Sequence, residues 1–284
     1  MANAITLAQI FVPILDEVYK NEAITSALDG ASDLARQGAN YNELIIPKMS
    51  MQGLADYSRS TGYVTGDVTL TNETVKCNFD RGRKFQVDAL DDIESVGIAF
   101  GRLASEFVRT QVIPELDAFR MAAYASTASV GKTEADLTGG ADVVAALRVA
   151  VSAMDEAEVP MTERHLFITP TLYGSIQDLD TTKSKAVLEG LTVHKIPQTR
   201  FYTAITQTAG GAGGYTKGGS AKNINFMLIH KPAVIQYQKH VVPKIIAPEQ
   251  NPDADAWIFG YRNVGIADVY ENKVAGIYLH NAAT

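Results

Sequence analysis

Residues 50–74 read SMQGLADYSRSTGYVTGDVTLTNET, and this stretch decides the expected fold. It holds eight Ser and Thr residues, three glycines and only scattered bulky apolar side chains, which are too few to form a core. On one side residues 42–49 are mostly apolar, and on the other residues 75–79 alternate at the two-residue period of a half-buried strand. Two strands around a poorly packed segment predict a long projecting hairpin, and compact domains rarely keep such a loop without a use.

The sequence before the hairpin predicts an arm of two short helices. Ile10, Ile14 and Val18 recur at a spacing of four, and Gly30 ends a second segment that Asn21 can cap and that runs through Leu28. Two short helices make no core of their own, so we expect this region to pack on something else.

The sequence after the hairpin predicts a turn at Asp80-Arg81-Gly82, a short strand at 84–87 and then a long helix. Apolar residues recur at spacings of three and four over 93–107 and again beyond Pro114. This proline should kink the helix or begin a new one. We therefore expect a helical rod of about 30 residues, on the order of 45 Å long, between Asp91 and Ala125.

The second half of the chain alternates between helices and strands. Residues 141–156 carry one apolar stripe of a helix, and Thr169-Pro170 has the form of a cap that opens a short helix. Residues 208–220 hold six glycines, which predicts a mobile, solvent-exposed loop. Further strands are expected at 165–168, 192–196, 225–229, 234–237, 257–261, 266–270 and 277–279.

Composition excludes several classes of protein. The 284 residues include 25 Lys and Arg against 32 Asp and Glu, and the net charge of -7 argues against a general nucleic-acid binder. Cys77 is the single cysteine, so no intramolecular disulfide can form, and its strand position predicts a small buried apolar group. We see neither a secretory signal nor an apolar run of about 18 residues, and we expect no membrane partner.

Three local patterns were weighed as chemical sites. Gly131-Lys132-Thr133 resembles the end of a phosphate-binding loop, but Ser126 stands where that motif needs its first glycine and no strand precedes it, which favours a flexible linker. Residues 81–84 form a basic cluster, and the acidic residues around it favour a salt-bridged turn. The histidines lack the local spacing of metal ligands: His165, His194, His230, His240 and His280. We therefore expect no catalytic, cofactor-binding or metal-binding residue, and no enzyme.

Four stretches in this order carry a resemblance to a known family: residues 44–92, 113–126 (IPELDAFRMAAYAS), 193–201 (VHKIPQTRF) and 256–278 (AWIFGYRNVGIADVYENKVAGIY). The chain resembles the major capsid proteins of tailed bacteriophages, whose Hong-Kong-97-type fold is shared with encapsulin shells. The resemblance spreads over most of the chain and depends on the order and spacing of the stretches. It contains no catalytic signature.

The resemblance implies an α+β capsid fold with named parts. These would be an N-terminal arm (1–38), an extended β-hairpin loop (39–83), a peripheral domain with a long spine helix (84–133), an axial domain (134–242) and return strands of the peripheral domain (243–284). The extended loop would lie on a neighbouring subunit. Its apolar residues are then the candidates for intersubunit contact: Leu54, Tyr57, Tyr63, Val64, Val68 and Leu70.

The function implied is structural. Copies would form pentamers and hexamers and close into an icosahedral shell around packaged double-stranded DNA, without sequence-specific contacts to that DNA. The chain would be assembled in the host cytoplasm and end in the virion, with a separate scaffolding protein and a portal as partners and no cofactor. Two alternatives stay open: an encapsulin-like nanocompartment that docks cargo peptides, and a nucleotide-binding enzyme that uses Lys132.

Overall fold

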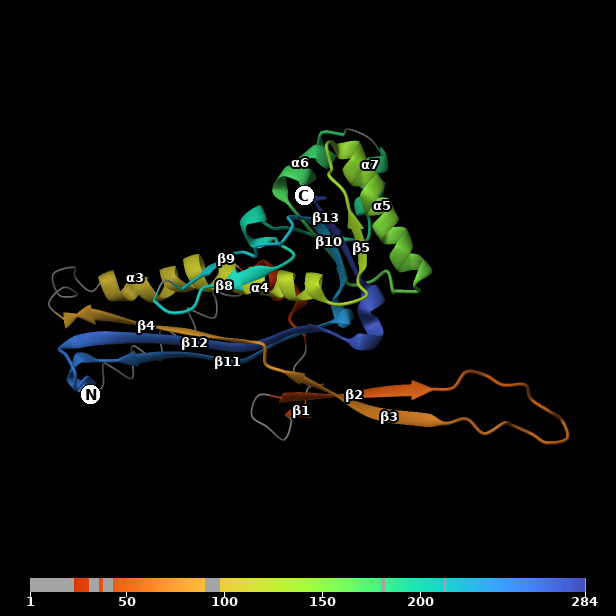
Figure 1. Cartoon of the computed structure of the whole chain (residues 1–284), viewed down its shortest axis with the longest axis horizontal. Coiled ribbons are helices and arrows are strands. Elements are labelled where there is room, and N and C mark those ends of the chain that lie inside the picture. The colour runs from red at the N-terminus through yellow and green to blue at the C-terminus, as the bar shows by residue number, and fades with distance from the viewer. Residues whose placement is uncertain are drawn as a thin grey trace. The chain divides into compact units, whose positions relative to one another are not determined.

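The computed structural model describes residues 23–30, 36–37, 43–89, 98–179, 182–211 and 213–283. The chain divides into two units, one of residues 1–30 with 79–284 and the other of residues 31–78. Figure 1 shows helices and sheets in the larger unit and strands in the smaller one. The helix predicted around Ile10, Ile14 and Val18 lies outside the described residues.

The larger unit contains a three-stranded antiparallel sheet in the order β11-β12-β4. Its central strand β12 (Ala256–Val269) pairs along one edge with β11 (Val234–Ile246) and along the other with β4 (Phe79–Asp88). Two of the expected strands, 257–261 and 266–270, are therefore one. The strand continues through the polar residues between them because these also have backbone partners in β4 and β11.

The turn predicted at Asp80-Arg81-Gly82 is wrong, because these residues belong to β4. Gly82 pairs with Arg262 of β12, and the Asp80 carboxylate lies 2.6 Å from the Arg262 guanidinium. A Cβ atom at Gly82 would lie 2.8 Å from the carbonyl oxygen of Tyr261, so the glycine permits close approach of the two strands. Strand pairing therefore overrides the local preference of these residues for a turn.

A long helix lies over this sheet (Figure 1). It consists of α3 (Ile98–Phe107), the π-helical turn η3 (Val108–Val112) and α4 (Ile113–Ser126). Pro114 lies in the first turn of α4, as one of the two expectations has it, and the π turn before it keeps the chain helical up to that point. A proline in a first turn removes no α-helical hydrogen bond. The expected rod is confirmed from residue 98 onward, and its predicted start at Asp91 lies outside the described residues.

A second sheet of five strands has the order β5-β13-β10-β6-β7. Its central strand β10 (Ile224–His230) is antiparallel to both neighbours, whereas the outer strands β5 and β7 pair in parallel. The other strands are β5 (Gly131–Glu134), β13 (Ile277–Asn281), β6 (Arg164–Ile168) and β7 (Thr192–Lys195). The apolar stripe of α5 (Gly140–Glu156) packs with this sheet in one buried cluster, as its spacing predicts.

Shorter elements connect these parts. The cap predicted at Thr169-Pro170 does open a helix, α6 (Pro170–Gln177). It is followed by α7 (Thr182–Leu188), η4 (Gln198–Arg200), β8 (Ile205–Gln207), β9 (Tyr215–Lys217), η5 (Lys231–Ala233), η6 (Pro248–Gln250) and η7 (Glu271–Gly276).

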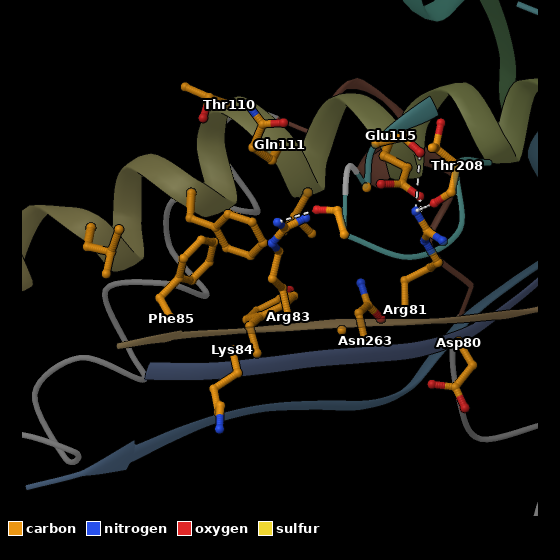
Figure 2. Close-up of a pocket in the computed structure, with 18 of the residues that line it drawn as sticks. Asp80, Arg81, Arg83, Lys84, Phe85, Thr110, Gln111, Glu115, Thr208 and Asn263 are labelled. Atoms are coloured by element: carbon orange, nitrogen blue, oxygen red, sulfur yellow. Dashed lines mark hydrogen bonds and ion pairs between the residues drawn. The ribbon is translucent and has the colours of Figure 1, made fainter. Parts of the chain in front are cut away.

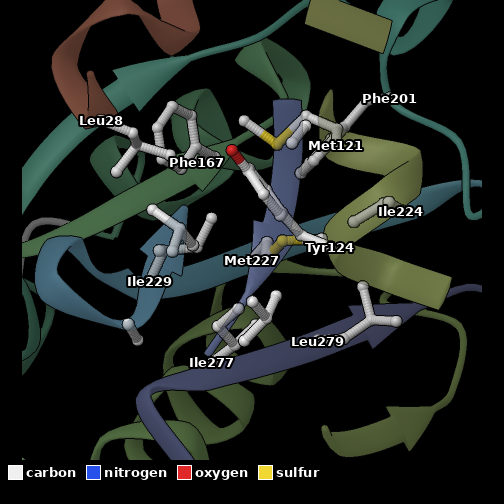
Figure 3. Close-up of a cluster of buried hydrophobic side chains, with 14 of the residues drawn as sticks. Leu28, Met121, Tyr124, Phe167, Phe201, Ile224, Met227, Ile229, Ile277 and Leu279 are labelled. Atoms are coloured by element: carbon white, nitrogen blue, oxygen red, sulfur yellow. The ribbon is translucent and has the colours of Figure 1, made fainter. Parts of the chain in front are cut away.

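One buried cluster joins the long helix to strands of both sheets. Figure 3 shows Met121 and Tyr124 of α4 among Phe167, Met227 and other apolar side chains, with Ala267 and Val269 of β12 in the same cluster. The Tyr124 hydroxyl donates to Gln236 Oε1 at 2.7 Å, so its polar end is also satisfied. This core fixes the helix over the sheet.

The smaller unit holds a three-stranded sheet in the order β1-β2-β3. Strands β2 (Glu43–Met51) and β3 (Val68–Lys76) form the expected hairpin, and the short β1 (Arg36–Gln37) pairs with β2. The alternation over 75–79 does not belong to one strand, since β3 ends at Lys76 and β4 begins at Phe79.

The carboxylate of Asp117 on α4 organises the chain that precedes the hairpin. It accepts hydrogen bonds from the backbone N–H of Thr25 at 3.1 Å and from the Thr25 hydroxyl at 2.6 Å. These bonds hold η1 (Ile24–Leu28), a 3-10 helix that is shorter than the helix expected over 21–28. Burial raises the pKa of Asp117, while the bonds from Thr25 and the charges of Arg120 and Arg200 oppose that rise.

Replacing Asp117 with alanine should destabilise the larger unit strongly. The change removes the buried carboxylate that faces both Arg120 and Thr25 and leaves the more exposed Asp29, 3.5 Å from Arg120, as an ion-pair partner of that arginine. The loss should lower the free energy of unfolding by about 3–5 kcal/mol. The exposed ion pair between Glu106 and Arg109 gives the control, since Glu106→Ala should cost about 0–1 kcal/mol. Urea unfolding measures both, and equal losses would contradict the assigned role.

Candidate intersubunit contact surface

The hairpin carries an apolar stripe on one face. Met49 pairs with Leu70 and Met51 pairs with Val68 across the ribbon. Paired residues share a face of an antiparallel ribbon, and so do residues two apart on one strand. These four side chains therefore lie together, and each is between 58% and 69% exposed in the single chain. We call Met49, Met51, Val68 and Leu70 the hairpin stripe.

The opposite face of the same ribbon is polar. Ser50 pairs with Thr69 between the two apolar pairs of the hairpin stripe, and both side chains are exposed. The ribbon is thus two-faced near its tip. A water-facing hairpin with no partner has no physical need for such a difference between its faces.

The hairpin tip, residues 52–67, is more open. An isolated bridge joins Ser58 to Gly62, whose positive φ of 78° suits the glycine at this turn. The rings of Tyr57 and Tyr63 lie 4.9 Å apart at 59°, yet both side chains stay exposed. The tip therefore presents aromatic surface that the described part of its own chain does not cover.

All six predicted contact candidates lie in the described hairpin, and all are exposed: Leu54, Tyr57, Tyr63, Val64, Val68 and Leu70. Their contact with another chain stays a prediction. Met49 and Met51 are not among the sequence-based candidates, because the apolar run at 42–49 predicts only a strand there. The alternation Met49-Ser50-Met51 against Val68-Thr69-Leu70 is the signal that could have found them.

A groove lies in the larger unit between the sheet and the long helix. Its volume is about 990 Å³, and Figure 2 shows side chains of β4 rising toward the helix on one side of the strand. Thr208, Gly210, Gly211, Gly213 and Gly214 line another part of the groove. Its lining mixes polar and charged side chains, among them Arg81, Glu106 and Glu115, with six apolar ones: Phe79, Phe85, Leu103, Phe107, Val112 and Tyr261.

Two arginines of β4 hold the glycine-rich loop beside this groove. The Arg81 guanidinium forms an ion pair with Glu115 at 2.8 Å and donates to the carbonyl oxygens of Thr208 and Gly214. Arg83 donates to the carbonyl oxygen of Gly211 at 2.7 Å. The expected turn is therefore wrong, although Arg81 does form an ion pair, and three carbonyls of the loop expected to be mobile and solvent-exposed accept hydrogen bonds from the two arginines.

Asn263 faces the same groove from β12. It pairs with Arg81 in the sheet, so the two side chains share a face, and Figure 2 shows the Asn263 amide between Arg81 and Arg83. The residue is 1% exposed, and neither amide atom has a hydrogen-bond partner among the described residues. A buried amide left unpaired costs about 1–3 kcal/mol, so this position is unusual in a folded chain.

The Gly131-Lys132-Thr133 stretch forms no phosphate-binding loop. It is part of β5, which pairs in parallel with β13 at the edge of the five-stranded sheet, so the favoured flexible linker is also wrong. Lys132 Nζ lies 2.5 Å from Glu134 Oε1. The hydrogen bonds from Lys132 and Lys222 lower the pKa of Glu134 to about 2.

Cys77 is half-buried, less than its strand position suggested. Among the described residues, no group of three or more His, Cys, Asp or Glu side chains could hold a metal ion. His165 Nδ1 and His194 Nε2 do lie 3.0 Å apart across β6 and β7, in a hydrogen bond that needs one neutral ring as acceptor.

No described helix combines the length and the apolar character that crossing a membrane requires. No family model matches the sequence, and no curated protein matches it either. Similarity is found among solved structures.

A chain of Gordonia phage Cozz is similar with a TM-score of 0.61 and 13% identity, over 93% of this chain and 87% of that one. The capsid structure of cyanophage P-SCSP1u gives a TM-score of 0.58 and 13% identity, over 88% and 86%. A virus-like particle from Pyrococcus furiosus gives 0.53 and 10%, over 93% and 98%. The chain thus has the fold of phage capsids and of an archaeal particle, consistent with the Hong-Kong-97-type resemblance of its sequence.

The His165 and His194 pair should make stability depend on pH. Burial lowers the pKa of both rings below the ordinary value of 6.5, and the charges of His194 and Lys231 add to the effect at His165, against Glu163. Below pH 6.5 the unfolded chain therefore binds more protons than the folded one. The stability that the two neutral rings contribute is present at neutral pH. It is lost as the pH falls through the lowered pKa values of His165 and His194.

Urea unfolding between about pH 5 and pH 7.5 measures this effect. The free energy of unfolding should fall on acidification, and the fall should be shallower in the His165→Gln, His194→Gln double variant. His230 and His280, whose pKa values burial also lowers, remain in that variant and preserve part of the slope. An unchanged slope in the double variant would contradict the prediction.

Proposed function

We propose that this chain is a major capsid protein, which assembles into an icosahedral shell around packaged viral double-stranded DNA. It acts as a structural protein without catalysis. The observation that carries the proposal is the hairpin stripe: four paired apolar side chains, exposed on one face of a ribbon. The similarity of the fold to capsid chains supports assembly into a shell.

The hairpin stripe needs a partner for a physical reason. A two-stranded ribbon has no second layer on which to bury a face, and such ribbons are marginally stable alone. Contiguous exposed apolar surface on a soluble chain commonly marks an interaction site. A second copy that covers the stripe with a different surface makes a heterologous contact, and contacts of this type generate rings when their rotation closes. Pentamers and hexamers are such rings.

In this proposal the parts of the subunit keep the bounds that the capsid resemblance implies. The extended loop is 39–83, and the long helix is the spine of a peripheral domain built from 84–133 and 243–284, where β4 pairs with β12. The axial domain is 134–242. The flanking strands β5 and β13 join its five-stranded sheet from outside that range, which ties the two domains together.

Other partners enter the proposal from the capsid resemblance. A separate scaffolding protein and a portal would guide assembly in the host cytoplasm, and the finished subunit would reside in the virion. The net charge of -7 suits a wall that encloses DNA without sequence-specific contacts.

Polar substitution of the hairpin stripe should abolish assembly and leave the subunit folded. Roughly 300 Å² of apolar contact contributes on the order of 7 kcal/mol per hairpin at about 25 cal/mol per Å², before the entropy cost of association. The variant Met51→Gln with Val68→Thr removes the pair nearest the tip. Electron microscopy should then show no shells, while circular dichroism and the melting temperature stay those of the parent.

The neighbouring pair on the opposite face gives a matched control. Ser50→Gln with Thr69→Gln changes the same number of residues at adjacent positions and should still form shells. Normal shells from the stripe variant would refute its role as a contact, and unfolding of that variant would place the stripe in a core.

An encapsulin-like nanocompartment is the second candidate. The observation in its favour is the similarity to the virus-like particle from Pyrococcus furiosus, which covers 98% of that chain. Both candidates share the fold and the proposed contact, and they differ in what the shell contains.

The contents of purified particles separate the two candidates. We expect particles from the native source to hold nuclease-protected double-stranded DNA, with an absorbance at 260 nm that exceeds that of the protein alone. Particles that hold a protein cargo and no protected DNA would favour the nanocompartment. Particles expressed without other genes serve as the empty control.

A further inference from the structure

The methionines of the chain fall into two groups by exposure. Of the seven in the sequence, all but Met1 lie in the described residues. Three of them are at most 1% exposed and belong to the buried clusters: Met121, Met154 and Met227. The other three are at least 58% exposed: Met49, Met51 and Met161. Oxidants in solution therefore reach the thioether sulfur atoms of the second group, while packing shields those of the first.

Two of the exposed methionines belong to the hairpin stripe. Met49 and Met51 lie two apart on β2, so their side chains share the face that also carries Val68 and Leu70 of β3. The aliphatic side chains of β3 resist mild oxidants, whereas a thioether accepts an oxygen atom and becomes a sulfoxide. The hairpin stripe thus contains two positions at which oxidation converts an apolar side chain into a polar one.

The reaction is the transfer of one oxygen atom. With hydrogen peroxide as the oxidant, a lone pair of the sulfur forms the S–O bond while the O–O bond of the peroxide breaks, and water leaves. The thioether is oxidised by two electrons, and the peroxide is reduced by two. Methionine sulfoxide reductase reverses the step with a dithiol as the reductant, because the sulfoxide oxygen then leaves as water and the dithiol becomes a disulfide.

We propose that Met49 and Met51 are oxidation sites through which peroxides hold unassembled subunits in a folded state that assembles poorly. This inference rests on the proposed function, because it concerns the regulation of the same contact. Both side chains are already exposed in the single chain, so their oxidation costs the subunit no packing. A sulfoxide that a partner covers loses its hydration without a matched donor, and each one should raise the concentration needed for assembly about tenfold.

Assembly should itself stop this oxidation. In the proposed shell a second copy covers the hairpin stripe, so peroxide no longer reaches the sulfur atoms of Met49 and Met51. Subunits that are oxidised first are therefore blocked, whereas subunits that assemble first are protected at these two positions. The modification acts on the unassembled chain and leaves finished shells intact.

Peroxide treatment before and after assembly tests the proposal. Unassembled subunits and finished shells are treated with hydrogen peroxide, and peptide mass spectrometry gives the fraction of sulfoxide at each methionine. In the treated subunits we expect sulfoxide at Met49 and Met51, an unchanged circular dichroism spectrum and, by light scattering, an assembly concentration raised about a hundredfold when both are oxidised. Methionine sulfoxide reductase with dithiothreitol should restore assembly. In the shells both positions should stay unoxidised.

Two variants serve as matched controls. Met49→Leu with Met51→Leu keeps the hairpin stripe apolar at similar volume and should assemble equally well before and after peroxide. This variant retains Met161 and Cys77, so a loss of its assembly on oxidation would trace the effect to another residue and overturn the proposal. Met161→Leu removes the third exposed methionine and should lose assembly on oxidation as the parent does.

The outcomes separate this proposal from the proposed function. Unimpaired assembly of parent subunits that carry both sulfoxides overturns the oxidation control and leaves the proposed function standing. Equal sulfoxide yields at Met49 and Met51 in shells and in unassembled subunits show that the hairpin stripe stays uncovered, and this result also overturns the proposal. Untreated parent subunits that never assemble refute the proposed function itself.

Discussion

The pairing of β12 along both of its edges is the interaction on which the larger unit depends. This strand brings β4 and β11 into one sheet, and it joins residues as far apart as Asp80 and Arg262, which are 182 positions apart along the chain. The long helix packs on one face of the resulting sheet, and that face forms the floor of the groove. Contacts of such high sequence separation form late and slowly, so the groove is completed only when folding is nearly finished.

This same pairing explains where sequence reasoning succeeded and where it failed. The helix at 140–156 and four strands of the five-stranded sheet, β6, β7, β10 and β13, follow from local apolar patterns, whereas β5 stands where a linker is expected. The turn expected at Asp80 and the break expected inside 256–269 depend on local sequence alone. Pairing with strands that are distant in the sequence overrides both expectations. Pro114 shows the same limit of local sequence reasoning, since it follows a π turn that no neighbouring residue predicts.

The candidate contact surface was predictable only in part. Exposure of the hairpin residues follows from a segment too poor in apolar groups to form a core. Which side chains share a face depends on register, and a shift of one residue would exchange Met49 and Met51 for Ser50. The unpaired amide of Asn263 could not be found at all from sequence, because an unsatisfied group is defined by every element that surrounds it.

The two-faced hairpin has a consequence for the subunit before it meets its partner. Strand β3 is an edge of its sheet, and near the tip it adds exposed apolar side chains to an open backbone, the combination that promotes aggregation. Closer to its end, Thr74 and Lys76 make the same edge polar or charged. Newly synthesised subunits therefore either assemble in order or precipitate. The outcome depends on how fast a partner covers each hairpin. Slow, dilute synthesis favours order, and a sudden excess of free chains favours insoluble material.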